Sequence, residues 1–479
     1  METLFQQLRE YSESDIYPYH MPGHKRQEIG DLRRQLSALD ITEIEGFDNL
    51  HQPEKILKEL QEYAAGAYGA EETFYLVGGS TSGILSAVSA AVPRGGKLLI
   101  ARNCHKSVYH AAYLRQLQIS YLYPEVVPEI GICEAVTPKQ VEETLEKEKD
   151  ICAVLIVSPT YEGRIAEVSK IADIVHRYSI PLIVDEAHGA HLGFHPAFAS
   201  GSSRAGADLV ITSVHKTLPA MTQTALLHVN GQLIDRQLLK RYLRIYQSSS
   251  PSYVLMASIG NAVCVAKEKG DILFQQLYEN WKKMLDKLAV CRALTLWPAA
   301  TLPEIEYRQH QDIGKLVISV KNTGMTGKAL YTKLLQEYGL QMEMACDNYV
   351  LAMFTIGDVP EGFKRLTNAL LEIDSELEKI ESDKKTEAYL QREKECISFA
   401  RAWDQPMTWV GLQDAVGRYV GEFVNIYPPG TPILVPGELF EETDRQLIEQ
   451  YLTDGLEVQG ISHQRGEYGL MVLSDQASI

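Results

Sequence analysis

The chain has 479 residues, of which 45% are hydrophobic and 23% are charged, a composition typical of a folded globular protein. Its 46 basic and 63 acidic residues give a formal net charge of −17, which repels phosphate backbones and anionic lipid headgroups. We therefore expect no nucleic-acid or membrane partner, and instead a small cationic ligand. The sequence has neither a long apolar run nor a signal-peptide pattern, and its seven scattered cysteines form no CxxC pair, so we expect a cytoplasmic protein with free thiols and no metal site.

Residues 1–52 are predicted to form an N-terminal segment of loops, because MPGHKR at 21–26 and EIEGFDNLHQP at 43–53 are rich in polar and turn-forming residues. Pro53 is expected to open the helix that follows, since its fixed φ suits the first helical turn. Apolar residues then recur at helical spacing as far as Tyr68, and Gly69 is expected to end this helix.

Residues 53–310 are predicted to form a large α/β domain. Short apolar runs indicate strands at 97–101, 120–126, 153–158, 181–187, 208–214 and 224–229, and a helical pattern covers 168–179. Several runs are apolar at successive positions, which is typical of strands buried on both faces. Such alternation of strands and helices predicts a mostly parallel sheet, whose functional residues gather at the carboxyl ends of its strands.

Two smaller units are expected after residue 310. Residues 311–375 are predicted to form an α+β domain, with strands at 315–322 and 349–357 and a helix over 326–338. The stretch 372–395 is dense in mixed charge and reads as a solvated helix face or a linker. Residues 376–479 are expected to form a C-terminal domain that contains YPPGTPILVPGE at 427–438.

Lys216 stands at the end of the predicted strand 208–214, within the sequence SVHK. A lysine at a strand end is usually only solvated, but an amine that forms a Schiff base works best when it is partly desolvated. Ser213 and His215 lie two residues apart, on one side of an extended chain, and both can bind an anionic oxygen.

Asp185 ends the apolar run PLIV. Taken alone it would read as a structural carboxylate, but beside a Schiff-base lysine it can keep a pyridine nitrogen protonated and so make the ring an electron sink. Glu186 points to the opposite face and is the weaker candidate. Ala187 returns to the side of Asp185 and is small enough to lie beneath a flat ring.

The sequence GGSTSG at 78–83 lies between a predicted strand and a predicted helix, where free N–H groups and the helix dipole form an anion site that includes Ser80 and Thr81. It lacks the GxxxxGK[ST] pattern, so a single phosphate fits better than a nucleoside triphosphate. His105 follows the strand 97–101 and could stack on a ring. A lysine for an imine, an acid for a ring nitrogen, hydroxyls for one phosphate and an imidazole for a ring face together describe pyridoxal 5′-phosphate.

The sequence resembles the Orn/Lys/Arg decarboxylase family, within the aspartate-aminotransferase fold class (fold type I) of pyridoxal-phosphate enzymes. The resemblance implies a large domain with a mostly parallel seven-stranded sheet and a smaller α+β C-terminal domain. The matching segments run in family order along nearly the whole chain: MPGHK (21–25), GFDNLH (46–51), GGSTSG (78–83), RNCHKS (102–107), SPTYEG (158–163), DEAHGAHLGFH (185–195), TSVHKTLPAMTQ (212–223), SSSPSY (248–253) and YPPGTPILVPGE (427–438).

The resemblance also implies a role for individual residues. Lys216 would be the Schiff-base lysine, Asp185 the partner of the pyridine nitrogen and His105 the stacking residue. The implied phosphate ligands are Ser80, Thr81, Ser213 and His215, joined by Ser248 and Ser249 from the neighbouring subunit, so a homodimer with shared active sites is expected. The candidates for substrate contact are Thr160, Tyr161, Asp48, His51 and Glu438.

Three functions are compatible with these residues. The first is α-decarboxylation of arginine, lysine or ornithine, which gives CO2 and the polyamine precursor agmatine, cadaverine or putrescine; RNCHKS and the C-terminal YPPG and PGE sequences favour it. The second is transamination or another lyase reaction on the same fold. The third is a catalytically silent regulatory relative, which the presence of Lys216, Asp185 and His105 disfavours. Longer bacterial members of the family carry an N-terminal receiver-like domain, and we expect this chain to be a short form without one.

Overall fold

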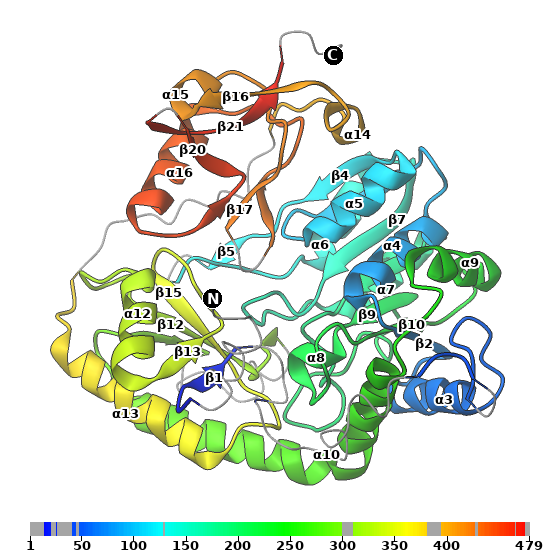
Figure 1. Cartoon of the computed structure of the whole chain (residues 1–479), viewed down its shortest axis with the longest axis horizontal. Coiled ribbons are helices and arrows are strands. Elements are labelled where there is room, and N and C mark those ends of the chain that lie inside the picture. Colours follow the sequence, from blue (N-terminus) through cyan, green and yellow to red (C-terminus); the bar gives the residue numbers. More distant parts are fainter. Residues whose placement is uncertain are drawn as a thin grey trace.

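The computed structural model describes residues 14–20, 25, 41–44, 47–127, 130–298, 310–380, 394–426, 430–464 and 466–474. Most of MPGHK and the residues YPP at 427–429 lie outside these ranges. Figure 1 shows a large domain around a central sheet, a smaller domain beside it and a C-terminal domain above both.

The large domain is organised by a seven-stranded sheet in the order β2-β10-β9-β8-β7-β3-β4. Its strands are β2 (Glu72–Leu76), β3 (Lys97–Ala101), β4 (Gln118–Leu122), β7 (Ile151–Val157), β8 (Leu182–Asp185), β9 (Leu209–Thr212) and β10 (Ala225–Val229). Only β10 runs antiparallel to its neighbours. The predicted fold, α/β with a mostly parallel sheet, is confirmed.

Both faces of the sheet are buried, which explains the apolar runs. In β3, Leu98 and Ile100 belong to one core cluster, whereas Leu99 and Ala101 belong to another on the opposite face. The first face is covered by α4 (Gly79–Ala91), α5 (Lys106–Arg115) and α9 (Arg236–Tyr246), and the second by α6 (Pro138–Lys147) and α7 (Val168–Arg177). A strand covered by helices on both sides needs an apolar residue at every position.

Helix α3 (Ile56–Tyr68) ends where the sequence predicts but does not begin there. Gly69 adopts the left-handed conformation at φ +70° and caps the C-terminus. The expectation that Pro53 opens the helix is wrong, since the helix starts at Ile56. The carboxylate of Asp48 provides the N-terminal capping instead, because it accepts hydrogen bonds from the backbone N–H groups of Glu54, Lys55 and Leu57.

The 36-residue helix α10 (Tyr253–Leu288) leads from the large domain into the smaller one and packs against α13 (Pro360–Glu376) (Figure 1). The smaller domain has an antiparallel sheet in the order β11-β12-β15-β14, with helix α12 (Gly327–Tyr338) packed on it. These strands are β11 (Thr295–Trp297), β12 (Lys315–Ser319), β14 (Met344–Ala345) and β15 (Tyr349–Met353). Strand β11 precedes residue 310, so this sheet begins earlier than the expected domain boundary. The N-terminal strand β1 (Tyr17–Tyr19) joins the same domain by pairing with β13 (Leu340–Met342).

The C-terminal domain has its own hydrophobic core and two three-stranded sheets. These contain β16 (Met407–Gly411), β20 (Ile461–Gln464) and β21 (Glu467–Leu473) in one sheet, and β17 (Val424–Ile426), β18 (Pro432–Leu434) and β19 (Val458–Gln459) in the other, with α16 (Glu442–Thr453) alongside. Of the charge-dense stretch 372–395, the first residues complete α13, and 381–393 lie outside the described residues. In the part of the chain that the structure describes, no helix combines the length and apolarity needed to cross a membrane.

Candidate active site

A cavity of about 590 Å³ opens at the carboxyl ends of the central strands, between the large and the smaller domain. The ends of β7 and β8 and the segments after β2, β3, β7, β8 and β9 line it from the large domain, and residues of α12, β13 and the β13–β14 connection line it from the smaller domain. Nine of the predicted site residues line it: Ser80, Thr81, His105, Tyr161, Asp185, Ala187, Ser213, His215 and Lys216. Predicted residues from five segments of the sequence thus meet in one space.

Lys216 lies in the short helix α8 (Val214–Thr217), directly after β9. Its Nζ is 3.0 Å from Nε2 of His188. Burial lowers the pKa of Lys216, while the nearby charges of Asp185 and Glu343 act in the opposite direction. A lysine with a lowered pKa has more of the neutral amine that attacks carbonyl carbons.

Asp185 and Glu186 are adjacent acids with opposite surroundings. Asp185 ends β8, is 5% exposed, and accepts a hydrogen bond of 3.1 Å from the backbone N–H of Ala187. Burial raises the pKa of Asp185, and the charge of Lys216 lowers it. Glu186 faces away from the cavity and accepts hydrogen bonds from the backbone N–H and the hydroxyl of Ser202, while its burial raises its pKa to about 8.

Hydroxyl and backbone groups gather at the start of α4. Gly79 begins this helix at φ +69°. Oγ of Ser80 lies 2.6 Å from Oγ of Ser213, and both residues line the cavity. Thr81 follows in the same helical turn. A helix N-terminus with two convergent hydroxyls has the donors that a phosphate group requires. The Nδ1–H of His215 donates to the carbonyl of Thr224, and burial lowers the pKa of His215 to about 4.

The ring of His105 is held in one orientation at the cavity wall. It caps the N-terminus of α5, where its Nδ1 accepts a hydrogen bond of 3.2 Å from the backbone N–H of Ser107. Burial lowers the pKa of His105 to about 3, so the ring is neutral and carries its proton on Nε2. A neutral, fixed imidazole suits stacking against a flat ring.

The comparisons with known proteins agree with this geometry. Residues 2–361 match the model of the family described as Orn/Lys/Arg decarboxylase, major domain, and residues 383–464 match that of its C-terminal domain. The chain belongs to the Orn/Lys/Arg decarboxylase family. It is 30% identical to an arginine decarboxylase of Bacillus anthracis, over 95% of this chain and 94% of the relative.

More distant decarboxylases share the fold and extend beyond the matched region. The constitutive lysine decarboxylase of Escherichia coli is 22% identical, over 94% of this chain and 76% of that protein. The crystal structure of the Francisella novicida lysine decarboxylase superposes with a TM-score of 0.77 at 18% identity, covering 98% of this chain and 80% of that one. The fold is therefore fold type I, and the chain is a carboxy-lyase that depends on pyridoxal 5′-phosphate.

The residues that line the cavity of this decarboxylase fit that cofactor. Asp185 is a buried carboxylate suited to a protonated ring nitrogen, Ala187 leaves room beneath a ring, and the Ser80–Ser213 hydroxyl pair suits one phosphate. Two buried polar atoms of the cavity wall, Oδ1 of Asn103 and Nδ1 of His188, have no hydrogen-bond partner within the described residues. Bound cofactor or substrate can supply such partners.

Two of the ionisable residues that line the cavity, His188 and Glu343, were not predicted from the sequence. His188 belongs to the quoted segment DEAHGAH, but it lies beyond the end of β8, where strand alternation no longer predicts which way a side chain points. Glu343 comes from the smaller domain, between β13 and β14, and no motif marks it. The cavity-lining Tyr161, predicted as a substrate contact, donates a hydrogen bond of 2.5 Å to Oε1 of Glu343.

Six predicted residues do not line this cavity: Thr160, Asp48, His51, Glu438, Ser248 and Ser249. Thr160 is buried and closes a turn with Arg164. The carboxylate of Glu438 is bound by Arg102 and by the backbone N–H of Val435. The carboxylate of Asp48 accepts hydrogen bonds from backbone N–H groups at the start of α3. These two acids therefore hold protein structure together in positions where we expected substrate contact.

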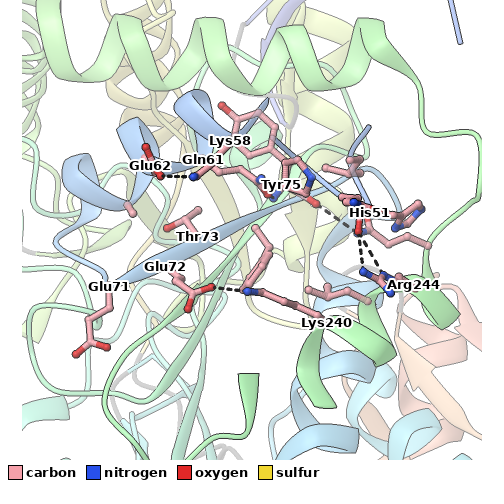
Figure 2. Close-up of a pocket in the computed structure, with 17 residues that line it drawn as sticks. His51, Lys58, Gln61, Glu62, Glu71, Glu72, Thr73, Tyr75, Lys240 and Arg244 are labelled. Carbon is pink, nitrogen blue, oxygen red and sulfur yellow. Dashed lines mark hydrogen bonds and ion pairs between the residues drawn. The ribbon is translucent and has the colours of Figure 1, made fainter. Parts of the chain in front are cut away.

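His51 and Ser248 lie together outside this cavity. Nε2 of His51 is 2.7 Å from the carbonyl oxygen of Ser248, and Arg244 donates to the carbonyl oxygen of His51. His51 and Arg244 line a second pocket of about 460 Å³ along the edge strand β2, where Lys240 pairs with Glu72 (Figure 2). This second pocket and the active-site cavity share no lining residue.

Proposed function

We propose that this decarboxylase removes the α-carboxylate of arginine, lysine or ornithine, releasing CO2 and agmatine, cadaverine or putrescine as a polyamine precursor in the cytoplasm. Arginine is the first substrate to test, because the relative from Bacillus anthracis, matched over nearly its full length, is named for it. The observation that carries the proposal is the convergence of Lys216, Asp185 and His105 on one cavity.

Each of these residues has a distinct task. When bound, pyridoxal phosphate supplies the electron sink that accepts the electron pair released as CO2 leaves. Asp185 would hold a proton on the ring nitrogen, and Lys216 would bind the cofactor covalently between turnovers. His105 would pack against the ring face, while Ser80, Thr81, Ser213 and His215 would hold the phosphate.

His215 places a condition on the phosphate contact. Its Nδ1–H is already donated to Thr224, so the neutral ring offers only an acceptor at Nε2. It can donate to the phosphate only when protonated, and a nearby anion raises the pKa of a histidine. We therefore expect cofactor binding to take up a proton at His215.

Product analysis tests the proposed reaction. The holoenzyme is incubated separately with arginine, lysine and ornithine, and the amine products are identified by mass and the CO2 is measured. One amine formed together with an equal amount of CO2 supports the proposal. A keto acid would show transamination instead, and the absence of any product from all three would point to a silent relative.

We also propose that the enzyme is a homodimer in which Ser248 and Ser249 reach the phosphate site of the partner subunit. Both serines are exposed and lie outside the cavity of their own chain, next to His51. A cyclic dimer is also the commonest symmetric assembly. If each site is completed by association, the cofactor stabilises the dimer. Equilibrium sedimentation with and without the cofactor checks this, and a fully active monomer would overturn it.

A further inference from the structure

Strand β2 lies at the edge of the central sheet, so one side of its backbone has no neighbouring strand among the described residues. Glutamine side chains bind that side instead. Gln61, in α3, accepts a hydrogen bond of 3.0 Å from the backbone N–H of Tyr75 (Figure 2). A glutamine amide has both a donor and an acceptor, as a peptide group does, so it can take the place of a neighbouring strand.

Val77, the first residue after β2, has both of its backbone polar groups bound by glutamine side chains. Its N–H donates to Oε1 of Gln247 at 2.9 Å, and its carbonyl oxygen accepts from Nε2 of Gln223 at 2.7 Å. Gln247 also donates to the carbonyl oxygen of Tyr75 at 3.3 Å, so its amide binds two backbone groups of one edge. Val77 and Gln247 are buried, and these bonds therefore satisfy backbone groups that would otherwise be costly to bury.

Val77 leads directly into the start of α4, where the proposed function assigns the phosphate of the cofactor. Only Gly78 and Gly79 separate it from Ser80. The N–H of Gly79 donates to the carbonyl oxygen of Gln223 at 2.9 Å, so Gln223 binds both the residue before the turn and the turn itself. Gln223 has φ +83°, a left-handed conformation that is uncommon outside glycine and that persists where the surrounding contacts hold it.

Gln247 joins the same backbone to a second part of the proposed phosphate site. It caps the C-terminus of α9, and the next two residues are Ser248 and Ser249, which we propose reach the partner subunit. The side chain of Gln247 is held by the edge of β2, while its main chain begins the serine segment. The position of Gln247 therefore affects both the turn before α4 and the start of that segment.

We propose that Gln223 and Gln247 are positioning residues for the cofactor phosphate, which hold Val77 and thereby fix the start of α4. Neither glutamine is among the described residues that line the active-site cavity, so both act through the backbone. An anion site at a helix N-terminus requires its donors to converge on one point, and a turn that moved would lose this alignment. The inference rests on the proposed assignment of the phosphate to Ser80, Thr81 and Ser213.

The test compares two ligands that differ only in the phosphate group, pyridoxal 5′-phosphate and pyridoxal. Their dissociation constants are measured by absorbance titration of the whole chain after removal of the cofactor, for the wild type, Gln223→Met and Gln247→Met. Methionine is an unbranched side chain of similar length that lacks the amide donor and acceptor. Gln61→Met is the matched control, because it removes the bond to Tyr75, two residues further from the turn.

We expect Gln223→Met and Gln247→Met each to weaken binding of pyridoxal 5′-phosphate by about 10-fold, an effect comparable to losing one hydrogen bond to a charged group. Binding of pyridoxal should be nearly unchanged, because Lys216 and Asp185 keep their positions. The ratio of the two dissociation constants therefore reports the alignment of the phosphate donors. Gln61→Met should lower the melting temperature and leave this ratio at the wild-type value.

The outcomes separate this inference from the proposed function. If the wild type binds pyridoxal as tightly as pyridoxal 5′-phosphate, the proposed phosphate site fails. If the wild type prefers the phosphate form, and a folded variant of either glutamine keeps that preference in full, the inference is overturned. Equal weakening of both ligands would also overturn it, because the glutamines would then support the fold alone. Should one variant not fold, the other decides, since the two side chains bind Val77 from different segments.

Discussion

Two cationic side chains follow strands of the same sheet, and they differ in what surrounds them. Arg102, directly after β3, donates to the carbonyl oxygens of Pro432 and Ile433 and to both carboxylate oxygens of Glu438. Burial, the largest single influence, lowers the pKa of Arg102, but Glu438 together with the nearby Tyr109, Tyr121 and Cys104 holds that pKa above its usual range. Lys216, after β9, contacts His188. Burial lowers the pKa of His188 well below its ordinary value.

The comparison shows that the partners of a buried cation decide what it does. Arg102 has acceptors fixed around its guanidinium and joins the C-terminal domain to the sheet. Lys216 has a neutral neighbour and a lowered pKa, so its amine is available for chemistry. Substitutions at these two strand ends should therefore affect different properties: stability at Arg102, and reaction at Lys216.

The largest effect is expected for Lys216→Ala. Removing the only amine proposed to bind the cofactor covalently should lower kcat on the order of 10⁴-fold or more. Borohydride reduction followed by intact-mass measurement should attach the cofactor to the wild-type chain and not to this variant. Lys240→Ala, at a lysine of the second pocket, is the matched control and should behave as the wild type. Cofactor that remained attached to the Lys216→Ala chain would disprove the assignment.

Arg102→Met is expected to act on stability. It leaves Glu438 buried without its counterion, which should cost about 3–5 kcal/mol of unfolding free energy. Thermal unfolding measures the loss. The double variant Arg102→Met/Glu438→Leu should recover part of it, because no unpaired charge then remains. A melting temperature equal to that of the wild type would mean that the pair does not fasten the C-terminal domain.

Asp185→Asn should reduce kcat by about 10²- to 10³-fold. The neutral amide lacks the negative charge that would keep the ring nitrogen of the cofactor protonated. The control is its neighbour, Glu186→Gln, which changes an acid of the same strand end that faces Ser202 instead. That variant should remain within a few-fold of wild-type kcat. Steady-state kinetics compare the two, and equal losses would show that burial rather than position makes Asp185 important.

Glu186 should also make stability depend on pH. The pKa of Glu186 is about 8 in the folded chain and lower in the unfolded chain. Between these two pKa values the folded state binds one proton more than the unfolded state, so the free energy of unfolding falls as pH rises towards 8. Between about pH 6 and pH 8 the loss should be about 2 kcal/mol. Glu186→Gln removes this contribution, so its melting temperature should fall less than that of the wild type over the same range. Parallel melting curves would contradict the prediction.

The smallest effect is expected for the double variant Ser248→Ala/Ser249→Ala. If these hydroxyls donate to the phosphate in the partner subunit, their loss should weaken cofactor binding by about 10- to 100-fold and leave the isolated chain folded. Cofactor titration by absorbance measures the change. Ser250→Ala, in the same loop, is the control. Unchanged affinity in the double variant would remove these serines from the proposed shared site.

Much of the fold could be predicted because its signals are local. Helix α3 ends at the expected glycine, β3 coincides with the apolar run 97–101, and α12 differs from its predicted range by one residue. The start of α3 could not be predicted from Pro53, because the capping acid Asp48 is brought to the helix by the folding of a loop.

The sequence by itself determined which chemical groups stand at the strand ends, because a polar residue that directly follows a buried strand must lie at the edge of the sheet. Lys216, Asp185, His105 and the serines of α4 were found in this way. Only the tertiary structure decided that Glu343 lines the active-site cavity whereas Asp48 and Glu438 lie outside it. Asp48 and Glu438 are engaged by backbone N–H groups and by an arginine, whereas Glu343 meets Tyr161 across 182 positions of the chain. The role of a carboxylate depends on the donors that surround it, and those donors come from segments that only folding brings together.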